Sequence, residues 1–281
     1  MALLVDFDRD EFISRVLAED LGIGGDLTSN ATIGADAMFS AEMNARQPLV
    51  IAGLDLAAAF FRALDPNVRI EPLAFDGGSI AAGSTLLRLH GNARAMLASE
   101  RSALNTLQHL SGIATLTRRY VEAIAGTAAT LLDTRKTIPG LRVLEKYASR
   151  MGGAQNHRLR LDDAILIKDN HVAVCGGVGE AVRRAKAANP DMEVQVEVDH
   201  VDQIEPALAA GANRLLLDNM PPPVLVEAVR LVARRVPLEA SGGVSLETIR
   251  AIAETGVDFI SVGRITQSAP AVDIGLDYTL S

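Results

Sequence analysis

The chain has 281 residues, 48% of them hydrophobic, and it carries a formal net charge of -8 at pH 7. This length and apolar content indicate a globular protein of one large or two ordinary domains, whereas the acidic balance argues against a general nucleic-acid binder. Its single cysteine, Cys175, excludes an intramolecular disulfide and a cysteine-rich zinc cluster.

The first residues, MALLVDFDRDEF, become charged before an apolar run of signal length can form, and no run of about 18 apolar residues occurs. We therefore expect a cytoplasmic protein without a membrane span. Apolar residues from Phe7 to Leu21 recur at helical spacing and predict a helix that ends at Gly22. Residues 38–91 alternate in short runs around one helical insert at 53–64, which indicates a small α/β domain.

Residues 75–91 resemble the hammerhead turn of biotinyl and lipoyl carriers, a non-enzymatic alternative, but they contain no lysine that could hold a prosthetic group. Residues 92–125 show helical spacing interrupted at Ser111-Gly112, which predicts two helices. The first of them contains Arg101, which is either a solvated arginine paired with Glu100 or a functional cation.

From Thr130 onward, a short apolar run ending in a polar residue alternates with a helical pattern, and the runs are TLLDT, AILIK, VQVEVD, RLLLD, PLEAS and DFISV. Such alternation predicts right-handed βαβ units around a parallel sheet. These six units are too few for a closed eight-stranded barrel. The sequence therefore favours an incomplete (open) parallel α/β barrel resembling a TIM barrel, with a doubly wound sheet as the alternative.

Both architectures place ligand sites beyond the carboxyl ends of the parallel strands, so we expect the polar residues there to converge. They are Asp133, Thr134, Arg135, Lys136, Lys168, Asp169, Glu197, Asp199, Asp218, Glu239, Ser241 and Gly263. Charges at nearly every strand end indicate a shared ligand, because an unpaired buried ion costs several kcal/mol.

The sign of these charges changes along the chain. Residues 133–171 hold eight Lys and Arg against five acidic residues, and a cationic island in an acidic chain indicates a site for a small polyanion. Its arginines and lysines suit carboxylates and phosphates. Glu197 and Asp218, on neighbouring strands, suit a Mg²⁺ ion that keeps water and phosphate oxygens as further ligands. The glycines of SGGV and VGR leave backbone N–H groups open to a phosphate.

Several long motifs recur in one known family. They are EDLGIGGDLTS at 19–29, ERSALNTLQHLSGIAT at 100–115, DTRKTIPGLR at 133–142, KYASRMGGAQNHR at 146–158, LIKDNH at 166–171, VQVEVD at 194–199, LLLDNM at 215–220, EASGG at 239–243 and GVDFISVG at 256–263. On these motifs the chain resembles the quinolinate phosphoribosyltransferase family nearly end to end.

The resemblance implies an N-terminal α/β sandwich domain of residues 1–112, joined by the tail 270–281, and an incomplete α/β barrel of residues 113–269. It implies a pentosyltransferase of NAD biosynthesis that uses quinolinate and phosphoribosyl pyrophosphate (PRPP), requires Mg²⁺, and releases nicotinate mononucleotide, pyrophosphate and CO2. It also implies a homodimer, or a higher homo-oligomer, with shared active sites.

The resemblance assigns three groups of site residues. Quinolinate would contact Arg135, Lys136, His157, Arg158 and Lys168, together with Arg101 of the partner subunit. PRPP and its magnesium would contact Thr134, Lys136, Lys168, Glu197 and Asp218, with Glu197 and Asp218 as the metal ligands. The phosphate would lie against Ser241, Gly242, Gly243 and Gly263.

The chain departs from the family pattern at a few positions. Where the family usually continues VGALTHS, this chain reads VGRITQS, which introduces Arg264 and Gln267. Ala154 and Arg160 stand where glycines are frequent. An enzymatic alternative is a Schiff-base aldolase with Lys168 as its nucleophile.

Overall fold

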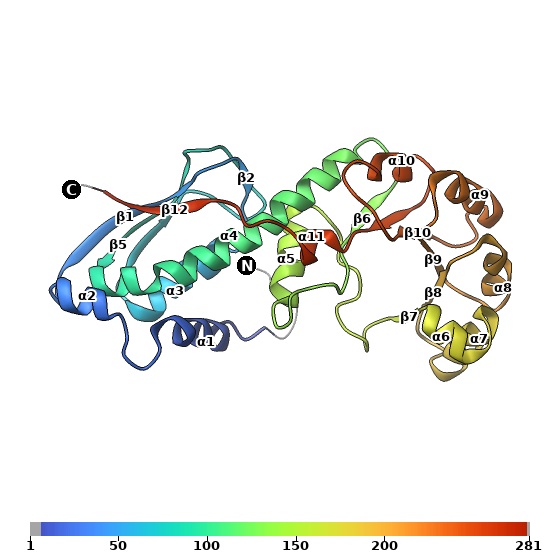
Figure 1. Cartoon of the computed structure of the whole chain (residues 1–281), viewed down its shortest axis with the longest axis horizontal. Coiled ribbons are helices and arrows are strands. Elements are labelled where there is room, and N and C mark those ends of the chain that lie inside the picture. Colours follow the sequence, from blue (N-terminus) through green and yellow to red (C-terminus); the bar gives the residue numbers. More distant parts are fainter. Residues whose placement is uncertain (1–6, 280–281) are drawn as a thin grey trace. The chain divides into compact units, whose positions relative to one another are not determined.

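The computed structural model describes residues 7–279, which divide into two compact units (Figure 1). The first unit comprises the residues up to Arg118, Val143–Gly153 and those from Ser268 onward, and the second comprises Arg119–Arg142 and Ala154–Gln267. The domain boundaries expected from the sequence stay a prediction.

An antiparallel four-stranded sheet with the strand order β12-β1-β5-β3 forms the framework of the first unit. Its strands are β1 (Met38–Ala45), β3 (Arg69–Pro72), β5 (Thr85–Asn92) and β12 (Ile274–Tyr278), and a separate pair is made of β2 (Leu49–Val50) and β4 (Ser79–Ile80). Strand β12 comes from the end of the described chain and pairs with β1, with Tyr278 opposite Ala41.

The helices of the first unit pack through apolar faces. They are α1 (Arg9–Leu21), α2 (Leu27–Thr32), α3 (Leu54–Leu64), most of α4 (Ala93–Ala123) and most of α5 (Arg142–Gly152). The Asp8 carboxylate accepts the N–H groups of Asp10 and Glu11 and caps α1, which ends before Gly22 as predicted. The predicted helical insert is α3, whose Phe60 ring lies 6.2 Å from the Phe12 ring of α1.

The prediction of two helices between residues 92 and 125 was wrong, because α4 runs unbroken through Ser111 and Gly112. A Cβ atom on Gly112 would lie 2.2 Å from the Pro270 carbonyl oxygen, so the glycine permits close packing of the C-terminal segment. The Ser111 hydroxyl accepts the Ala52 N–H at 3.1 Å. The Ser-Gly pair therefore serves tertiary contacts and does not interrupt the helix.

A six-stranded sheet with the order β6-β11-β10-β9-β8-β7 forms the second unit, and every pairing in it is parallel. Its strands are β6 (Thr130–Leu132), β7 (Ile165–Ile167), β8 (Val194–Val198), β9 (Arg214–Asp218), β10 (Leu238–Ser241) and β11 (Phe259–Ser261). From β7 to β11 each strand lies beside its predecessor, and the first strand, β6, lies beside the last, β11. This winding in one direction is that of an open barrel, because a doubly wound sheet would reverse its strand order at a switch point.

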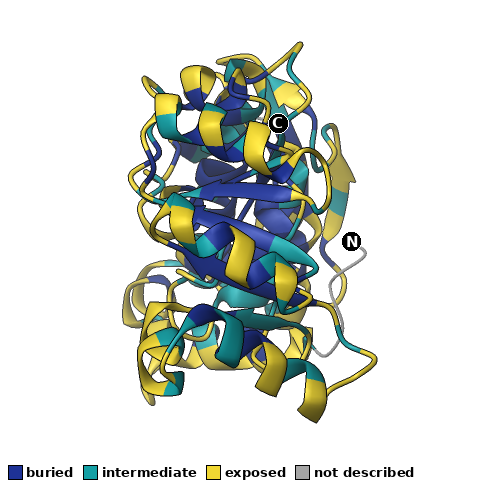
Figure 2. Ribbon diagram, turned by 90° about the vertical axis from the view of Figure 1, so that its right-hand side faces the viewer, coloured by how far each residue is buried: buried dark blue, intermediate teal, exposed yellow. Residues whose placement is uncertain are grey.

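Helices follow the strands of this sheet, as the sequence predicted. They are α6 (Asp169–Cys175), α7 (Val178–Ala188), the 3₁₀ turn η1 (Val201–Gln203), α8 (Ile204–Ala209), α9 (Pro222–Val232), α10 (Ile249–Ala253) and α11 (Arg264–Gln267). Figure 2 shows buried strands in dark blue and helices whose outer residues are exposed in yellow. Within residues 7–279, no helix has the length and apolar character needed to cross a membrane.

Candidate active site

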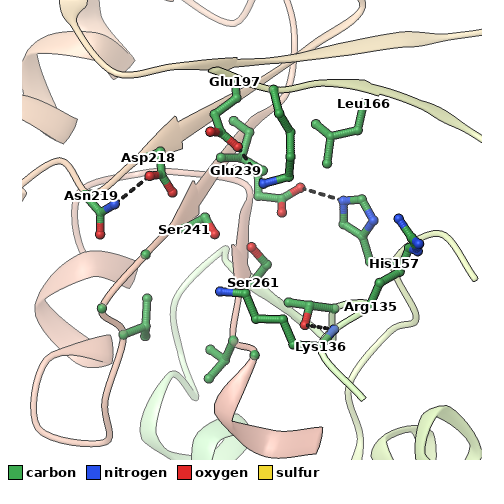
Figure 3. Close-up of a pocket in the computed structure, with 18 of the residues that line it drawn as sticks. Arg135, Lys136, His157, Leu166, Glu197, Asp218, Asn219, Glu239, Ser241 and Ser261 are labelled. Carbon is green, nitrogen blue, oxygen red and sulfur yellow. Dashed lines mark hydrogen bonds and ion pairs between the residues drawn. The ribbon is translucent and has the colours of Figure 1, made fainter. Parts of the chain in front are cut away.

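A cavity of about 600 Å³ opens where the six parallel strands of the second unit end (Figure 3). Most of the predicted strand-end residues line it, namely Thr134, Arg135, Lys136, Lys168, Glu197, Asp218, Glu239, Ser241 and Gly263. His157, Arg158, Gly242 and Gly243 line it too. The expected convergence is therefore observed, although Asp133, Asp169 and Asp199 are not part of the lining.

Arg135 and Arg158 both line the cavity, close enough for their charges to interact. Burial and the positive charge of Arg135 both lower the pKa of Arg158 below its ordinary value. The Arg135 Nε atom is buried and has no hydrogen-bond partner within the described chain. Two guanidinium groups held close together, one with an unused donor, favour an anion between them.

The segment that carries Arg158 is fixed by Asp133, which is fully buried at the end of β6. The Asp133 carboxylate accepts the backbone N–H of His157 at 2.8 Å and the side-chain amide of Asn156. Asp133 was predicted to face a ligand. It instead turns inward and sets the position of its neighbours, as a buried carboxylate must find donors within the protein.

The opposite wall carries carboxylates. Ligand oxygens of Glu197, Asp199 and Asp218 all lie within 4.8 Å of one another. Burial and then the negative charge of Glu197 raise the pKa of the Asp218 carboxyl, and the Lys168 Nζ atom donates to Glu197 Oε2 at 2.9 Å. A cluster of oxygen donors whose mutual repulsion is only partly neutralised fits a hard divalent cation. The sequence proposed Glu197 and Asp218 and missed Asp199 as a third donor.

A third side of the cavity is made of main chain. Gly242 adopts φ of 89°, and a Cβ atom there would lie 2.2 Å from the Asn219 Oδ1 atom. At Gly263 a Cβ atom would lie 2.7 Å from Lys136 Cδ. Glycine at these positions lets the Asn219 and Lys136 side chains approach the main chain closely, and both glycines line the cavity, where backbone N–H groups suit phosphate oxygens.

The floor holds a buried network that the sequence did not reveal. Glu239 is fully buried, and its Oε2 atom accepts a hydrogen bond from Gln195 Nε2 at 2.8 Å and forms an ion pair with Arg214, whose Nη2 atom lies 2.7 Å away. The same Oε2 atom lies 3.4 Å from His157 Nε2. Gln195 stands within the run VQVEVD and Arg214 begins the run RLLLD, and the only signal was that each is a polar residue in an apolar run.

Some of the remaining residues singled out from the sequence line the cavity, and others do not. Of the four departures from the family pattern, Arg264 and Gln267 line the cavity, whereas Ala154 and Arg160 do not. Arg101 lies in the part of α4 that belongs to the first unit, has an exposed side chain, and is not part of the lining.

Two family models match the chain. The model for the quinolinate phosphoribosyl transferase N-terminal domain matches residues 26–111, and the model for the C-terminal domain matches residues 113–277. Together they account for most of the sequence.

Curated proteins and solved structures agree with these matches. The chain is 45% identical over 277 residues to the nicotinate-nucleotide pyrophosphorylase (carboxylating) of Mycobacterium leprae, and the aligned region covers 97% of each protein. It is 42% identical over 272 residues to a probable enzyme of that name from Bacillus subtilis, covering 96% of this chain and 93% of the relative. The nicotinate-nucleotide pyrophosphorylase structure from Francisella tularensis superposes with a TM-score of 0.93 at 39% identity and covers 99% of this chain and 100% of its own.

Proposed function

The chain belongs to the quinolinate phosphoribosyltransferase family, and from that membership we propose that it converts quinolinate and PRPP into nicotinate mononucleotide, pyrophosphate and CO2 for NAD biosynthesis. One observation of the site supports this most directly. The cavity combines paired guanidiniums, clustered carboxylates and accessible glycines, which are the groups needed for a dicarboxylate, a metal and a phosphate together.

Quinolinate carries two carboxylates, and we assign them to the wall that contains Arg135, His157 and Arg158, with Lys136 and Lys168 nearby. No carboxylate of the described chain hydrogen-bonds the Arg135 or Arg158 side chain, while Arg158 Nη1 donates to the Ala164 carbonyl at 3.2 Å. A planar fork that is anchored at one end and free at the other suits bidentate binding of a carboxylate.

PRPP would lie across the remaining walls. We assign its 5′-phosphate to Ser241, Gly242, Gly243 and Gly263, and its pyrophosphate to Thr134, Lys136 and Lys168. The Gly263 backbone lies directly against the Lys136 side chain, so the two phosphate-binding regions adjoin. Arg264 adds one more positive charge on this side.

A magnesium ion fits the donor set of Glu197, Asp199 and Asp218, because hard carboxylate oxygens are the ligands that Mg²⁺ prefers. When bound, the ion would neutralise charge on the departing pyrophosphate. These carboxylates would hold it, and Lys168 would balance part of the charge that they carry.

The chemistry suits a site built for positioning. The quinolinate nitrogen approaches C1 of the ribose as the C1–O bond to pyrophosphate breaks, and positive charge develops on the sugar. Holding two reactants in such a geometry can supply about 7–11 kcal/mol of barrier reduction. The carboxylate beside the ring nitrogen then leaves as CO2, its bonding electrons stay on the ring carbon, and a proton replaces it.

We further propose a cytoplasmic homodimer in which Arg101 of the partner subunit completes each quinolinate site. In the described chain the Arg101 side chain is exposed and makes no ion pair, although its positive charge acts on the carboxyl of Glu100. A free cation on a rigid helix can reach a ligand in another subunit.

One assay tests the proposal. The purified protein is supplied with quinolinate and Mg²⁺, with and without PRPP, and both CO2 and nicotinate mononucleotide are measured. We expect equal amounts of the two products only when PRPP is present, and no CO2 when nicotinate replaces quinolinate. Release of CO2 without PRPP, or no nucleotide product, would contradict the assignment.

The alternatives predict other results. A Schiff-base aldolase needs Lys168 as a neutral amine, yet this side chain is ion-paired with Glu197, so we expect no adduct after borohydride reduction with a carbonyl substrate. A carrier module would show a mass increment on the intact chain, and residues 75–91 offer no lysine for one.

A further inference from the structure

His157 is held at both nitrogens of its ring. Its Nδ1 atom lies 2.8 Å from the backbone nitrogen of Arg158, and its Nε2 atom lies 3.4 Å from Glu239 Oε2. Figure 3 shows the Glu239 carboxylate directed at the imidazole ring. Each contact restricts which atoms can carry a proton.

The backbone contact decides the protonation state. A backbone N–H can only donate, so Nδ1 must keep its lone pair in order to accept from Arg158. The single proton of the neutral ring is then on Nε2, where it points at the Glu239 carboxylate. A doubly protonated ring would turn an N–H at Nδ1 toward the N–H of Arg158, and two donors would face each other.

Glu239 is itself fixed and cannot follow the ring. Its Oε2 atom also accepts a hydrogen bond from Gln195 of β8 and pairs with the charge of Arg214 of β9. Arg214 in turn lies over the Phe259 ring, 3.9 Å from its centre. A carboxylate held from two other strands gives the imidazole a rigid anchor.

The ring therefore holds the main chain that carries Arg158. The His157 N–H is accepted by Asp133 and the Arg158 N–H by the His157 ring, so consecutive amide groups are both fixed by side chains. An error of about 1 Å in the position of a substrate-holding group can cost about 100-fold in rate.

We propose that His157 acts as a neutral positioning residue, anchored by Glu239 at Nε2, which uses Nδ1 to set the orientation of Arg158, and that it does not bind quinolinate as a cation. The inference rests on the proposed function only for the identity of the ligand that Arg158 holds. The competing explanation is that the imidazolium itself contacts a quinolinate carboxylate, and that Glu239 merely balances the charge of Arg214.

The free enzyme gives a test that needs no substrate. The chain has five histidines, and nitrogen-15 NMR of histidine-labelled protein at pH 7 reports the protonation of each ring nitrogen. The His157 signals are identified by their loss in His157→Asn. We expect a proton on Nε2 and a lone pair on Nδ1, and either a doubly protonated ring or a proton on Nδ1 would overturn the proposal.

A matched pair of variants tests the consequence for binding. Asn at position 157 places its Oδ1 near the position of Nδ1 and keeps an acceptor for the Arg158 N–H, whereas Gln places its amide near Nε2 and loses that acceptor. We expect the quinolinate KM of H157Q to rise about 10- to 100-fold, the range seen when a supporting contact to a ligand is lost in metal sites. The rise in H157N should be clearly smaller. Equal losses in the two variants would overturn the proposal, because both remove the imidazole charge.

The anchor is tested by Glu239→Ala, with Glu145→Ala as its control. Glu145 is likewise a buried glutamate paired with a histidine, because its Oε1 atom lies 2.9 Å from His109 Nε2. We expect E239A to raise the quinolinate KM and leave the PRPP KM unchanged, and E145A to change neither. If E239A is folded and binds quinolinate normally, Glu239 is not the anchor of His157. If E239A does not fold, the NMR result and the two His157 variants test the proposal without it. If the enzyme does not use quinolinate, the proposed function is wrong. The NMR measurement on the free protein still tests the protonation state of His157, because it needs no substrate.

Discussion

The Lys168 ammonium lies 2.9 Å from Glu197 Oε2, so a cation assigned to substrate already neutralises a carboxylate assigned to the metal. The lysine side chain is 50% exposed and the glutamate only 6%. The contact therefore reaches from the cavity opening to its buried wall, and a metal ion must share Glu197 with the lysine.

Because Lys168 shares Glu197 with the metal, its substitution should change the affinities for Mg²⁺ and for quinolinate in opposite directions. Lys168→Met keeps the length of the side chain but removes the competing charge. We expect the free enzyme to bind Mg²⁺ more tightly and quinolinate more weakly, both measured by calorimetry. Lys136→Met is the control, because Lys136 makes no ion pair in the described chain and its loss should not strengthen Mg²⁺ binding.

Loss of either cavity arginine should weaken quinolinate without harming the fold. A hydrogen bond to a charged group contributes about 1.5–3 kcal/mol, so we expect Arg135→Ala and Arg158→Ala to weaken quinolinate binding by about 10- to 150-fold, as measured by calorimetry. Arg160→Ala is a suitable control, because Arg160 pairs with Asp162 and lies outside the cavity lining. Unchanged affinity in either cavity variant would remove that arginine from the site.

Amide variants of the metal-site carboxylates should separate turnover from binding. We expect Glu197→Gln and Asp218→Asn to lose Mg²⁺-dependent turnover while still binding quinolinate alone, because the dicarboxylate wall does not include them. Initial rates across a magnesium titration, together with calorimetry for quinolinate, measure the two effects. Wild-type rates at limiting magnesium in both variants would show that the metal binds elsewhere.

Glu239 should make stability depend on pH in the acid range. Burial acts to raise the pKa of its carboxyl, but the hydrogen bond from His157 and the positive charge of Arg214 lower it, and the pKa lies below the ordinary value of 4.5. The folded state therefore favours the carboxylate, and this stabilisation is complete above pH 4.5 and is lost as the pH falls through the lowered pKa.

Glu239→Gln should accordingly be less stable than wild type at pH 7, by up to about 3–5 kcal/mol, because Arg214 loses its buried partner. Urea unfolding at a series of pH values measures the difference in the free energy of unfolding. We expect the gap to narrow steadily in acid, and a gap that stays constant from pH 7 to pH 3 would show that the carboxylate is not stabilised by the fold.

The shared-site proposal predicts complementation. Dimers of Arg101→Ala chains should be inactive, because neither site receives Arg101 from its partner. Dimers of Lys136→Ala chains should be inactive too, because each cavity lacks its own Lys136. In a mixed dimer the two lesions fall in the same site and the other site is intact, so reshuffled mixtures should regain a fraction of wild-type activity. Mixed dimers that form, as shown by native mass spectrometry, yet remain inactive would contradict a shared site.

The barrel was predictable because each buried strand is a short apolar run with a polar residue at its end, and the parallel order brings those ends together. The unbroken helix α4 was not predictable, since Ser111-Gly112 looks like a break until the chain near Pro270 is seen to pack against the glycine. The buried contacts of Glu239 also escaped prediction. A linear pattern identifies polar residues in strands but does not show which of them meet from β8, β9 and β10.

Strand β12 has a consequence for the order in which the protein can be made. It occupies the edge of the first unit's sheet next to β1, yet some 230 residues are synthesised between the end of β1 at Ala45 and the start of β12 at Ile274. On the ribosome, β1 therefore waits with an unpaired edge while the second unit, which needs no residue beyond Gln267, emerges completely. The sheet of the first unit therefore cannot be completed until the last strand along the chain has been made, and until then the open edge of β1 can pair with a wrong strand.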